Sequence, residues 1–148
     1  MKKTNNKGFS LVELIVVVAI MAVLMVVIAP QMLRYVERTR IQRDNSAIAE
    51  IANAAKIAMA DETINGVVAV STTYDDIRAA SGTITFTTAD ALMTELGRIV
   101  GTVTLQSDAY STGTPGIDIT KDAQGNITIT GVGLVQPNDA TQTLTITY

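Results

Sequence analysis

The sequence has no cysteine, no histidine and no tryptophan among its 148 residues, and its aromatic side chains are two phenylalanines and four tyrosines. Without cysteine there can be no disulfide, no thiolate metal ligand and no cysteine nucleophile. Without histidine the commonest general base and metal ligand are missing. The formal net charge of −3 and the scarcity of aromatic rings disfavour a dedicated nucleic-acid site. We therefore predict a protein that is not an enzyme and that has no cofactor and no metal.

The remaining polar motifs do not change this prediction. Gly131-Val132-Gly133 lacks the third glycine of a dinucleotide-binding loop, and Pro137 follows it where a helix should begin. One set of side chains could supply oxygen ligands to calcium: Asp108, Asp118, Asp122, Gln124 and Asn126. Their spacing matches no calcium-loop signature, so aspartates that form turns are the simpler interpretation.

Apolar residues are concentrated near the N-terminus. Residues 14–29 are sixteen consecutive apolar residues, and the run extends back to Phe9 with interruptions at Ser10 and Glu13. As a helix, residues 9–29 would be ~31 Å long, about the thickness of a bilayer core. A domain this small has little room to surround such a helix on all sides. We therefore predict a membrane-inserted helix rather than a buried core helix.

The junction before this run carries a more specific pattern. Lys2 and Lys3 precede a string of eight residues, Lys7-Gly8-Phe9-Ser10-Leu11-Val12-Glu13-Leu14. The string resembles the class III signal peptide of type IV prepilins and the related pseudopilins. The resemblance implies that residues 1–8 are a leader, which a membrane peptidase removes by cutting between Gly8 and Phe9. It also implies that the same enzyme methylates the new amine of Phe9.

Glu13 is a carboxylate inside the apolar segment. Such a group costs several kcal/mol if it stays ionised and unpaired. It could reach back to water, because it lies only ~6 Å of helix beyond the predicted cut. The alternative, which the resemblance also implies, is an assembly charge pair with the Phe9 amine of its own or a neighbouring subunit. We expect the charge pair, which would help to place a new subunit in a growing filament.

Pro30 follows the apolar run, and the helical pattern resumes directly after it. A proline inside a helix removes one backbone hydrogen bond and clashes with the preceding turn, so we predict a kink at Pro30. In filaments of the family that the junction resembles, the stretch before such a proline can become extended. The corresponding stretch here is residues 22–30, where β-branched residues lower the helical propensity.

Residues 31–65 have the pattern of an amphipathic half-helix that ends at Asn65-Gly66. Its apolar positions recur at spacings of three and four: Ile41, Ile48, Ile51, Ala52, Ala55, Ala58 and Met59. The positions predicted to face away from this stripe are Arg38, Arg43, Asp44, Glu50 and Lys56. Together with the apolar half, residues 9–30, this predicts one long helix, interrupted at Pro30, from Phe9 to about Thr63.

Residues 66–148 are rich in threonine and read as a globular head. Alternation of apolar residues and threonine predicts strands at residues 103–105, 117–120, 127–130 and 144–147, with a hairpin turn at residues 122–126. Residues 87–97 are predicted to be a helix with Thr87 and Asp90 at capping-box spacing, and residues 74–76 to be a turn or a helix start.

We thus predict an α+β fold, in which an antiparallel sheet of three or four strands packs on the second half of the long helix. This is also the fold of the pilins. Their C-terminal disulfide loop cannot exist here, so the sheet itself must hold the C-terminus and Tyr148.

These features predict the precursor of a major pilin, the structural subunit of a type IV pilus. It would be a single-pass protein of the cytoplasmic membrane with its head outside, and later part of a cell-surface filament. The implied partners are further copies of the chain, the prepilin peptidase and methyltransferase, and the pilus assembly platform with its ATPase. One alternative is a pseudopilin of a type II secretion or DNA-uptake system. Another is a single-span membrane-anchored binding domain that never polymerises, which would have no reason to keep Glu13.

Overall fold

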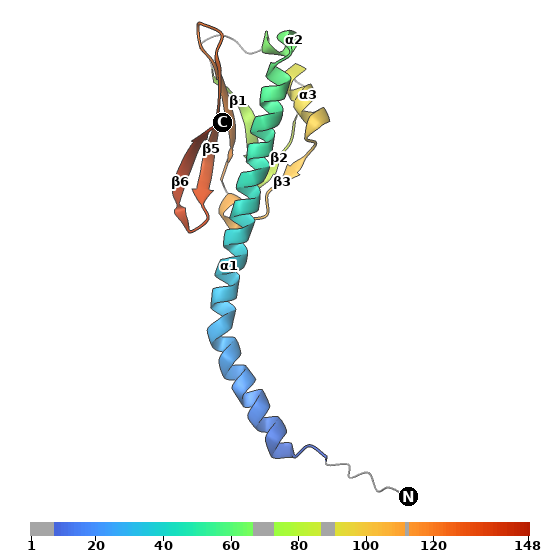
Figure 1. Ribbon diagram of the computed structural model, residues 1–148, viewed down its shortest axis with the longest axis vertical. Coiled ribbons are helices and arrows are strands. Elements are labelled where there is room, and N and C mark those ends of the chain that lie inside the picture. The colour runs from blue at the N-terminus through green and yellow to red at the C-terminus, as the bar shows by residue number, and fades with distance from the viewer. Residues whose placement is uncertain (1–7, 67–72, 87–90, 112) are drawn as a thin grey trace, which may run out of the picture. The chain divides into compact units, whose positions relative to one another are not determined.

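The computed structural model describes residues 8–66, 73–86, 91–111 and 113–148, and the chain divides into two compact units, residues 1–36 and 37–148 (Figure 1). The helix α1, Leu11–Met59, contributes to both units and contains Pro30. It ends earlier than predicted. Asp61 adopts an extended backbone, and its carboxylate accepts a hydrogen bond from the Thr63 N–H at 2.8 Å, which starts the separate short helix α2, Glu62–Asn65.

The predicted apolar stripe of α1 is buried in the second unit. All seven predicted residues are at most 3% exposed, and they share one hydrophobic core with residues of the sheet and of the helix α3, Ala91–Ile99, such as Ile117, Ile129 and Leu96. The prediction for Asp44 is wrong: its side chain was expected on the outer face of the helix but is only 2% exposed. A buried carboxylate needs hydrogen-bond donors, and the head provides them.

The head contains one six-stranded antiparallel sheet with the strand order β3-β2-β1-β4-β5-β6. The strands are β1 Thr73–Ala80, β2 Thr83–Ile84, β3 Val103–Thr104, β4 Gly116–Lys121, β5 Ile127–Gln136 and β6 Asp139–Thr147. Each of the four predicted strands coincides with one of these elements. The sheet is larger than predicted because β1 and β2 were not recognised.

The prediction of a turn or helix start at residues 74–76 is wrong, since this backbone belongs to β1. The register between β1 and β4 shifts between Tyr74 and Ile77, which marks an irregularity of the ladder at the two aspartates. Beyond it, Ile77 and Ala79 are buried in the core. Pairing with β4 and burial of these side chains therefore outweigh the local preference of Asp75-Asp76 for a turn.

The hairpin turn between β4 and β5 forms as predicted. The Gly125 N–H donates to the Asp122 carbonyl at 3.0 Å, and Gly125 has a φ of +88°, which glycine adopts without strain. The Asp122 carboxylate accepts from the N–H groups of Gln124 and Asn126 at 2.9 and 2.7 Å. The hydrogen bonds from Asn126 are the main reason that the pKa of Asp122 is lowered.

A helix also forms near the predicted residues 87–97, as α3, Ala91–Ile99, and a short 3-10 helix, η1, spans Asp108–Tyr110. The proposed capping pair Thr87 and Asp90 lies outside the described residues. The C-terminus is held by the sheet: β6 pairs with β5, and the Tyr148 N–H donates to the Ile129 carbonyl at 2.8 Å.

Candidate functional site

The predicted cleavage point lies in non-helical chain immediately before α1. Phe9 is 84% exposed, and a Cβ built on Gly8 would meet no atom within 4 Å. The peptide bond between Gly8 and Phe9 is therefore accessible from several sides, as a protease substrate must be. The basic residues Lys2, Lys3 and Lys7 lie outside the described residues.

Glu13 caps the first turn of α1. Its Oε2 accepts a hydrogen bond from the backbone N–H of Ser10 at 2.9 Å. Ser10 precedes the first helical residue, Leu11, so Ser10 and Glu13 stand at the spacing of a capping box, in which the acidic residue satisfies the N–H of the cap. This contact was not predicted, although the Ser-x-x-Glu pattern is a known signal for a helix start. The second carboxylate oxygen, Oε1, leaves Glu13 able to accept another donor.

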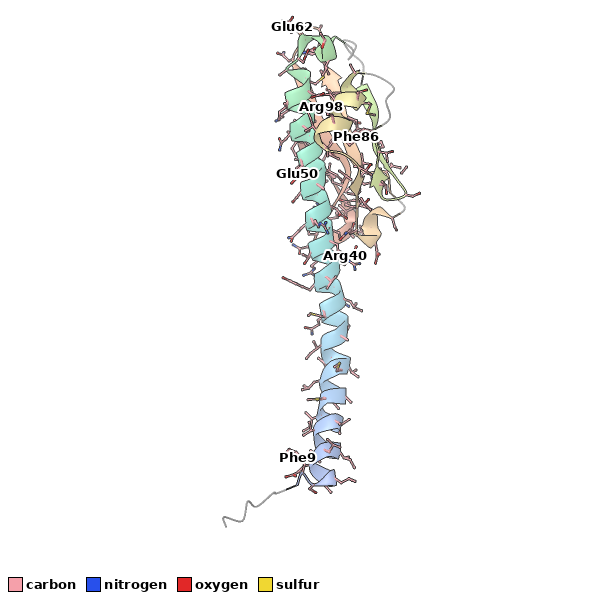
Figure 2. All side chains as sticks on the ribbon, turned by 90° about the vertical axis from the view of Figure 1, so that its right-hand side faces the viewer. Phe9, Arg40, Glu50, Glu62, Phe86 and Arg98 are labelled. Carbon is pink, nitrogen blue, oxygen red and sulfur yellow. The ribbon has the colours of Figure 1, made fainter. Side chains whose placement is uncertain are left out.

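The N-terminal part of α1 exposes apolar side chains on all its sides (Figure 2). An 18-residue window of α1 has a mean hydropathy of 3.2, and none of it is buried. The large apolar residues from Leu11 to Ile28 are each at least 44% exposed. A helix that is apolar all round requires an apolar environment, either lipid or other helices. By length and composition it can cross a bilayer.

Pro30 lies within this surface, and α1 continues through it. Proline has no N–H, so the carbonyl of Val26 lacks its usual helical donor. An open apolar groove of about 440 Å³ lies beside the proline and is lined by Met21, Leu24, Met25, Ile28, Ala29 and Met32. Three of these six side chains are methionines, which are flexible and adapt readily to a neighbouring apolar surface.

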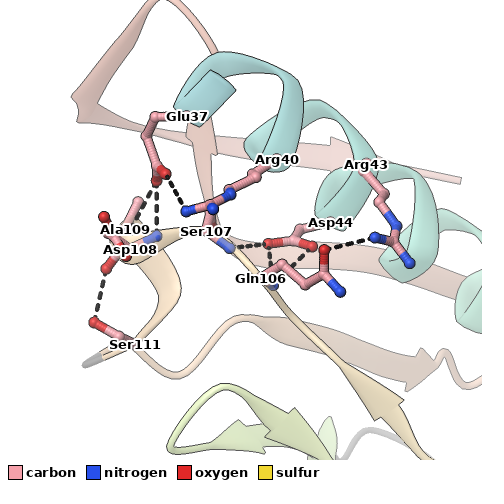
Figure 3. Close-up of polar contacts among 9 residues, drawn as sticks. All are labelled: Glu37, Arg40, Arg43, Asp44, Gln106, Ser107, Asp108, Ala109 and Ser111. Carbon is pink, nitrogen blue, oxygen red and sulfur yellow. Dashed lines mark hydrogen bonds and ion pairs between the residues drawn. The ribbon is translucent and has the colours of Figure 1, made fainter. Parts of the chain in front are cut away.

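In the second unit, two carboxylates of α1 bind the segment that follows β3 and the first two residues of η1 (Figure 3). The Asp44 carboxylate accepts from the N–H groups of Gln106 and Ser107, with its closest contact at 2.8 Å to Ser107. Two turns earlier, Glu37 Oε1 accepts from the N–H groups of Asp108 and Ala109, at 2.7 and 3.4 Å. Four consecutive backbone donors are thus satisfied by one face of α1, which fixes this loop on the helix.

A second polar link joins α1 to the sheet through Tyr110. Its hydroxyl donates to the Asn45 Oδ1 and accepts from the Val135 N–H, while the Asn45 amide donates to the Val135 carbonyl at 3.0 Å. Burial raises the pKa of the Tyr110 hydroxyl. This link could not be predicted from local sequence patterns, because its three residues are far apart along the chain.

Two of the three aspartates considered for calcium are engaged in other contacts. Asp118 forms an ion pair with Arg78, and Asp122 caps its own turn. Among the described residues, no three acidic side chains come together in a group that could hold a metal ion.

Residues 3–29 match the family model described as the prokaryotic N-terminal methylation motif. This motif is the class III signal peptide of type IV pilins and pseudopilins, so the resemblance seen at the junction is confirmed. Comparison with curated proteins and with solved structures gives no match. The N-terminus is that of a membrane-anchored, pilin-like or pseudopilin-like precursor, and such proteins are structural rather than enzymatic.

Proposed function

We propose that the chain is the precursor of a major pilin, which is cleaved, methylated and then assembled into a helical surface filament through its N-terminal helix. The observation that carries this proposal is an apolar stretch of α1 that is long enough to cross a bilayer and entirely exposed. The second unit, residues 37–148, accompanies it. This unit has its own hydrophobic core, to which no described residue of the apolar stretch contributes.

The same helical surface can serve two states of the protein. Before assembly, lipid covers the side chains around Leu24 and Ile28, which are 53% and 57% exposed in the isolated chain. In a filament, neighbouring helices would replace lipid as the apolar environment, since packing between helices and packing against lipid tails are similar in energy. The groove beside Pro30 offers room for side chains from such a neighbour.

Processing would occur at the exposed bond between Gly8 and Phe9. The prepilin peptidase removes residues 1–8 and methylates Phe9. Cleavage also removes three lysines, which leaves eight basic against fourteen acidic residues. The mature subunit is therefore acidic.

Glu13 would act in assembly as the acceptor for the new amine of Phe9. The capping contact with Ser10 occupies Oε2 and holds the carboxylate at the start of α1, on the side of the cleavage point. An incoming subunit could present its Phe9 amine to the remaining oxygen of a neighbour's Glu13. Such a pair, once removed from water, would fix the axial position of the subunit. The assembly platform and its ATPase would drive this insertion from the cytoplasmic membrane.

The decisive experiment is electron microscopy of the native cells with and without the gene for this chain. We expect long sheared fibres that label with an antibody against the head, disappear on deletion and return on complementation. Labelling confined to the cell envelope, with no fibres, would instead support a pseudopilin of a secretion or DNA-uptake system.

A further inference from the structure

The outer edge of β6 is a long strand edge that no described residue pairs with. The sheet has β3 at one edge and β6 at the other, and Figure 1 shows β6 with β5 as its neighbour. β3 has two residues and β6 has nine. A row of unpaired backbone N–H and C=O groups on such an edge is a template for another strand.

Over residues 143–147, β6 lacks the usual protection of an edge strand. Its one charged residue, Asp139, lies at its start, and a second register shift with β5, between Val135 and Gln136, places extra residues of β6 at 140–142. Residues 143–147 contain no charged side chain and no proline, and they are threonine, leucine and isoleucine. These residues favour strands. Ile146 is 37% exposed, and among the described residues of the second unit the only large apolar side chains that are more exposed are Ile57 and Ile99. Native proteins commonly place lysine, proline or a bulge at such an edge to prevent pairing.

The register shows which backbone groups point outward. The Tyr148 N–H donates to Ile129 of β5, and Ile146 stands opposite Gly131. The backbone N–H and C=O groups of successive residues in a strand point to opposite sides. The backbone groups of Thr143, Thr145 and Thr147 therefore point away from β5. The register shift between Gly131 and Leu134 adds its extra residue to β5, so β6 is regular over residues 143–147.

We propose that this edge is a self-association surface, at which β6 pairs antiparallel with β6 of a second copy of the chain. The short β3 edge cannot offer a strand of matching length, so pairing of β6 with β6 uses the longest ladder that the two edges allow. Maximal overlap of residues 143–147 puts Thr145 opposite Thr145 of the other copy. Ile146 then stands opposite the other copy's Leu144, which would cover its exposed surface. No like charges meet across this ladder.

The symmetry of this contact indicates whether it lies within one filament or between two filaments. An antiparallel pairing of identical strands is a two-fold contact, whereas the contact that propagates a polar filament is not two-fold. The inference rests on the proposed filament: β6 would join two neighbouring filaments through this two-fold contact, and so produce lateral bundles. Unassembled subunits in detergent would pair through the same edge.

Since the chain has no cysteine, single substitutions report this contact directly. In mature full-length protein solubilised in detergent, we expect mild oxidation to convert most of the Thr145→Cys variant into a disulfide-linked dimer. The Thr104→Cys variant, which places a thiol at an exposed position of the opposite edge strand β3, should stay monomeric. Equal dimer yields from both variants, or no dimer from Thr145→Cys, would overturn the proposal. So would a disulfide between Thr145→Cys and another protein in place of the dimer.

A charge pair at the two-fold axis tests the same contact in filaments. Thr145→Lys and Thr145→Asp should each give normal fibre yield but loss of bundles, because like charges meet at the axis. Thr104→Lys should bundle like wild type. Mixing Thr145→Lys filaments with Thr145→Asp filaments should restore bundles, and failure of the mixture to do so would contradict a two-fold axis at Thr145. Absence of wild-type fibres would refute the proposed function, whereas the cysteine result would still decide the edge contact.

Discussion

The buried carboxylate of Asp44 accepts a hydrogen bond from the backbone N–H of Ser107 at 2.8 Å, which ties the middle of α1 to the loop before η1. The Gln106 N–H binds the same carboxylate, and Glu37 binds the next two N–H groups along the loop. Figure 3 shows these contacts as a continuous row on one side of the helix. The loop is therefore positioned by charge-assisted hydrogen bonds rather than by apolar packing alone.

Removing the Asp44 carboxylate should destabilise the head strongly. In Asp44→Ala, two N–H groups lose a charged acceptor, and the cost is about 2–4 kcal/mol of unfolding free energy. Glu50→Ala is the matched control, because Glu50 lies on the exposed side of the same helix, and it should change stability by less than about 0.5 kcal/mol. Denaturant unfolding of both variants in detergent measures the difference. Similar small effects would mean that the loop holds its place without Asp44.

The turn between β4 and β5 should make stability depend on pH in the acid range. The pKa of Asp122 is lowered in the folded chain by hydrogen bonds from Asn126, so this aspartate stabilises the fold above its unfolded pKa, near 3.8. The contribution is lost as the pH falls through the lower pKa of the folded state. The stability difference between wild type and Asp122→Ala should thus be constant at neutral pH and shrink below about pH 4. A difference that does not change with pH would contradict this role.

Glu13 should matter for assembly more than for folding. A buried charge that loses its partner costs ~3–5 kcal/mol, so we expect Glu13→Ala to be folded, membrane-inserted and cleaved, but largely unable to form fibres when it is the sole copy. Glu13→Asp should be intermediate, since the charge remains but its reach shortens. Fibre yield and cleavage are measured on the same sample. Normal yield from Glu13→Ala would show that the carboxylate only caps its own helix and that apolar packing sets the register.

Pro30 should be the point at which α1 responds to assembly. In the isolated chain the helix continues through the proline, which leaves the Val26 carbonyl without its helical donor. In a filament map we expect a kink or an extended stretch within residues 22–30 and continuous helix beyond it. A straight and fully hydrogen-bonded helix through these residues would refute the prediction.

The sequence predicted the elements that depend on local pattern. The spacing of Ile41, Ile48 and Ile51 identified the buried face of α1, and the alternation with threonine located β3 to β6. The burial of Asp44 was not predicted, because a carboxylate between polar residues normally faces water and its hydrogen-bond donors lie 62 and 63 residues further along the chain. Strand β1 was not predicted, because Asp75-Asp76 favours a turn locally. Only the pairing with β4 makes this segment a strand.

At the N-terminus, one contact could have been predicted from the local sequence but was not. The motif identified Gly8, Phe9 and Glu13, and the match over residues 3–29 confirms the motif. Ser10 and Glu13 also form a capping-box pattern, which predicts the contact found between them. The roles of these residues in cleavage and assembly depend on an enzyme and on further subunits, so they remain predictions.

The most direct test of the account is intact-mass analysis, with N-terminal sequencing, of fibres sheared from native cells. The account predicts that the main component is residues 9–148 with a methylated amine on Phe9. A main component that still begins at Met1, or that begins beyond Ala29, would contradict it.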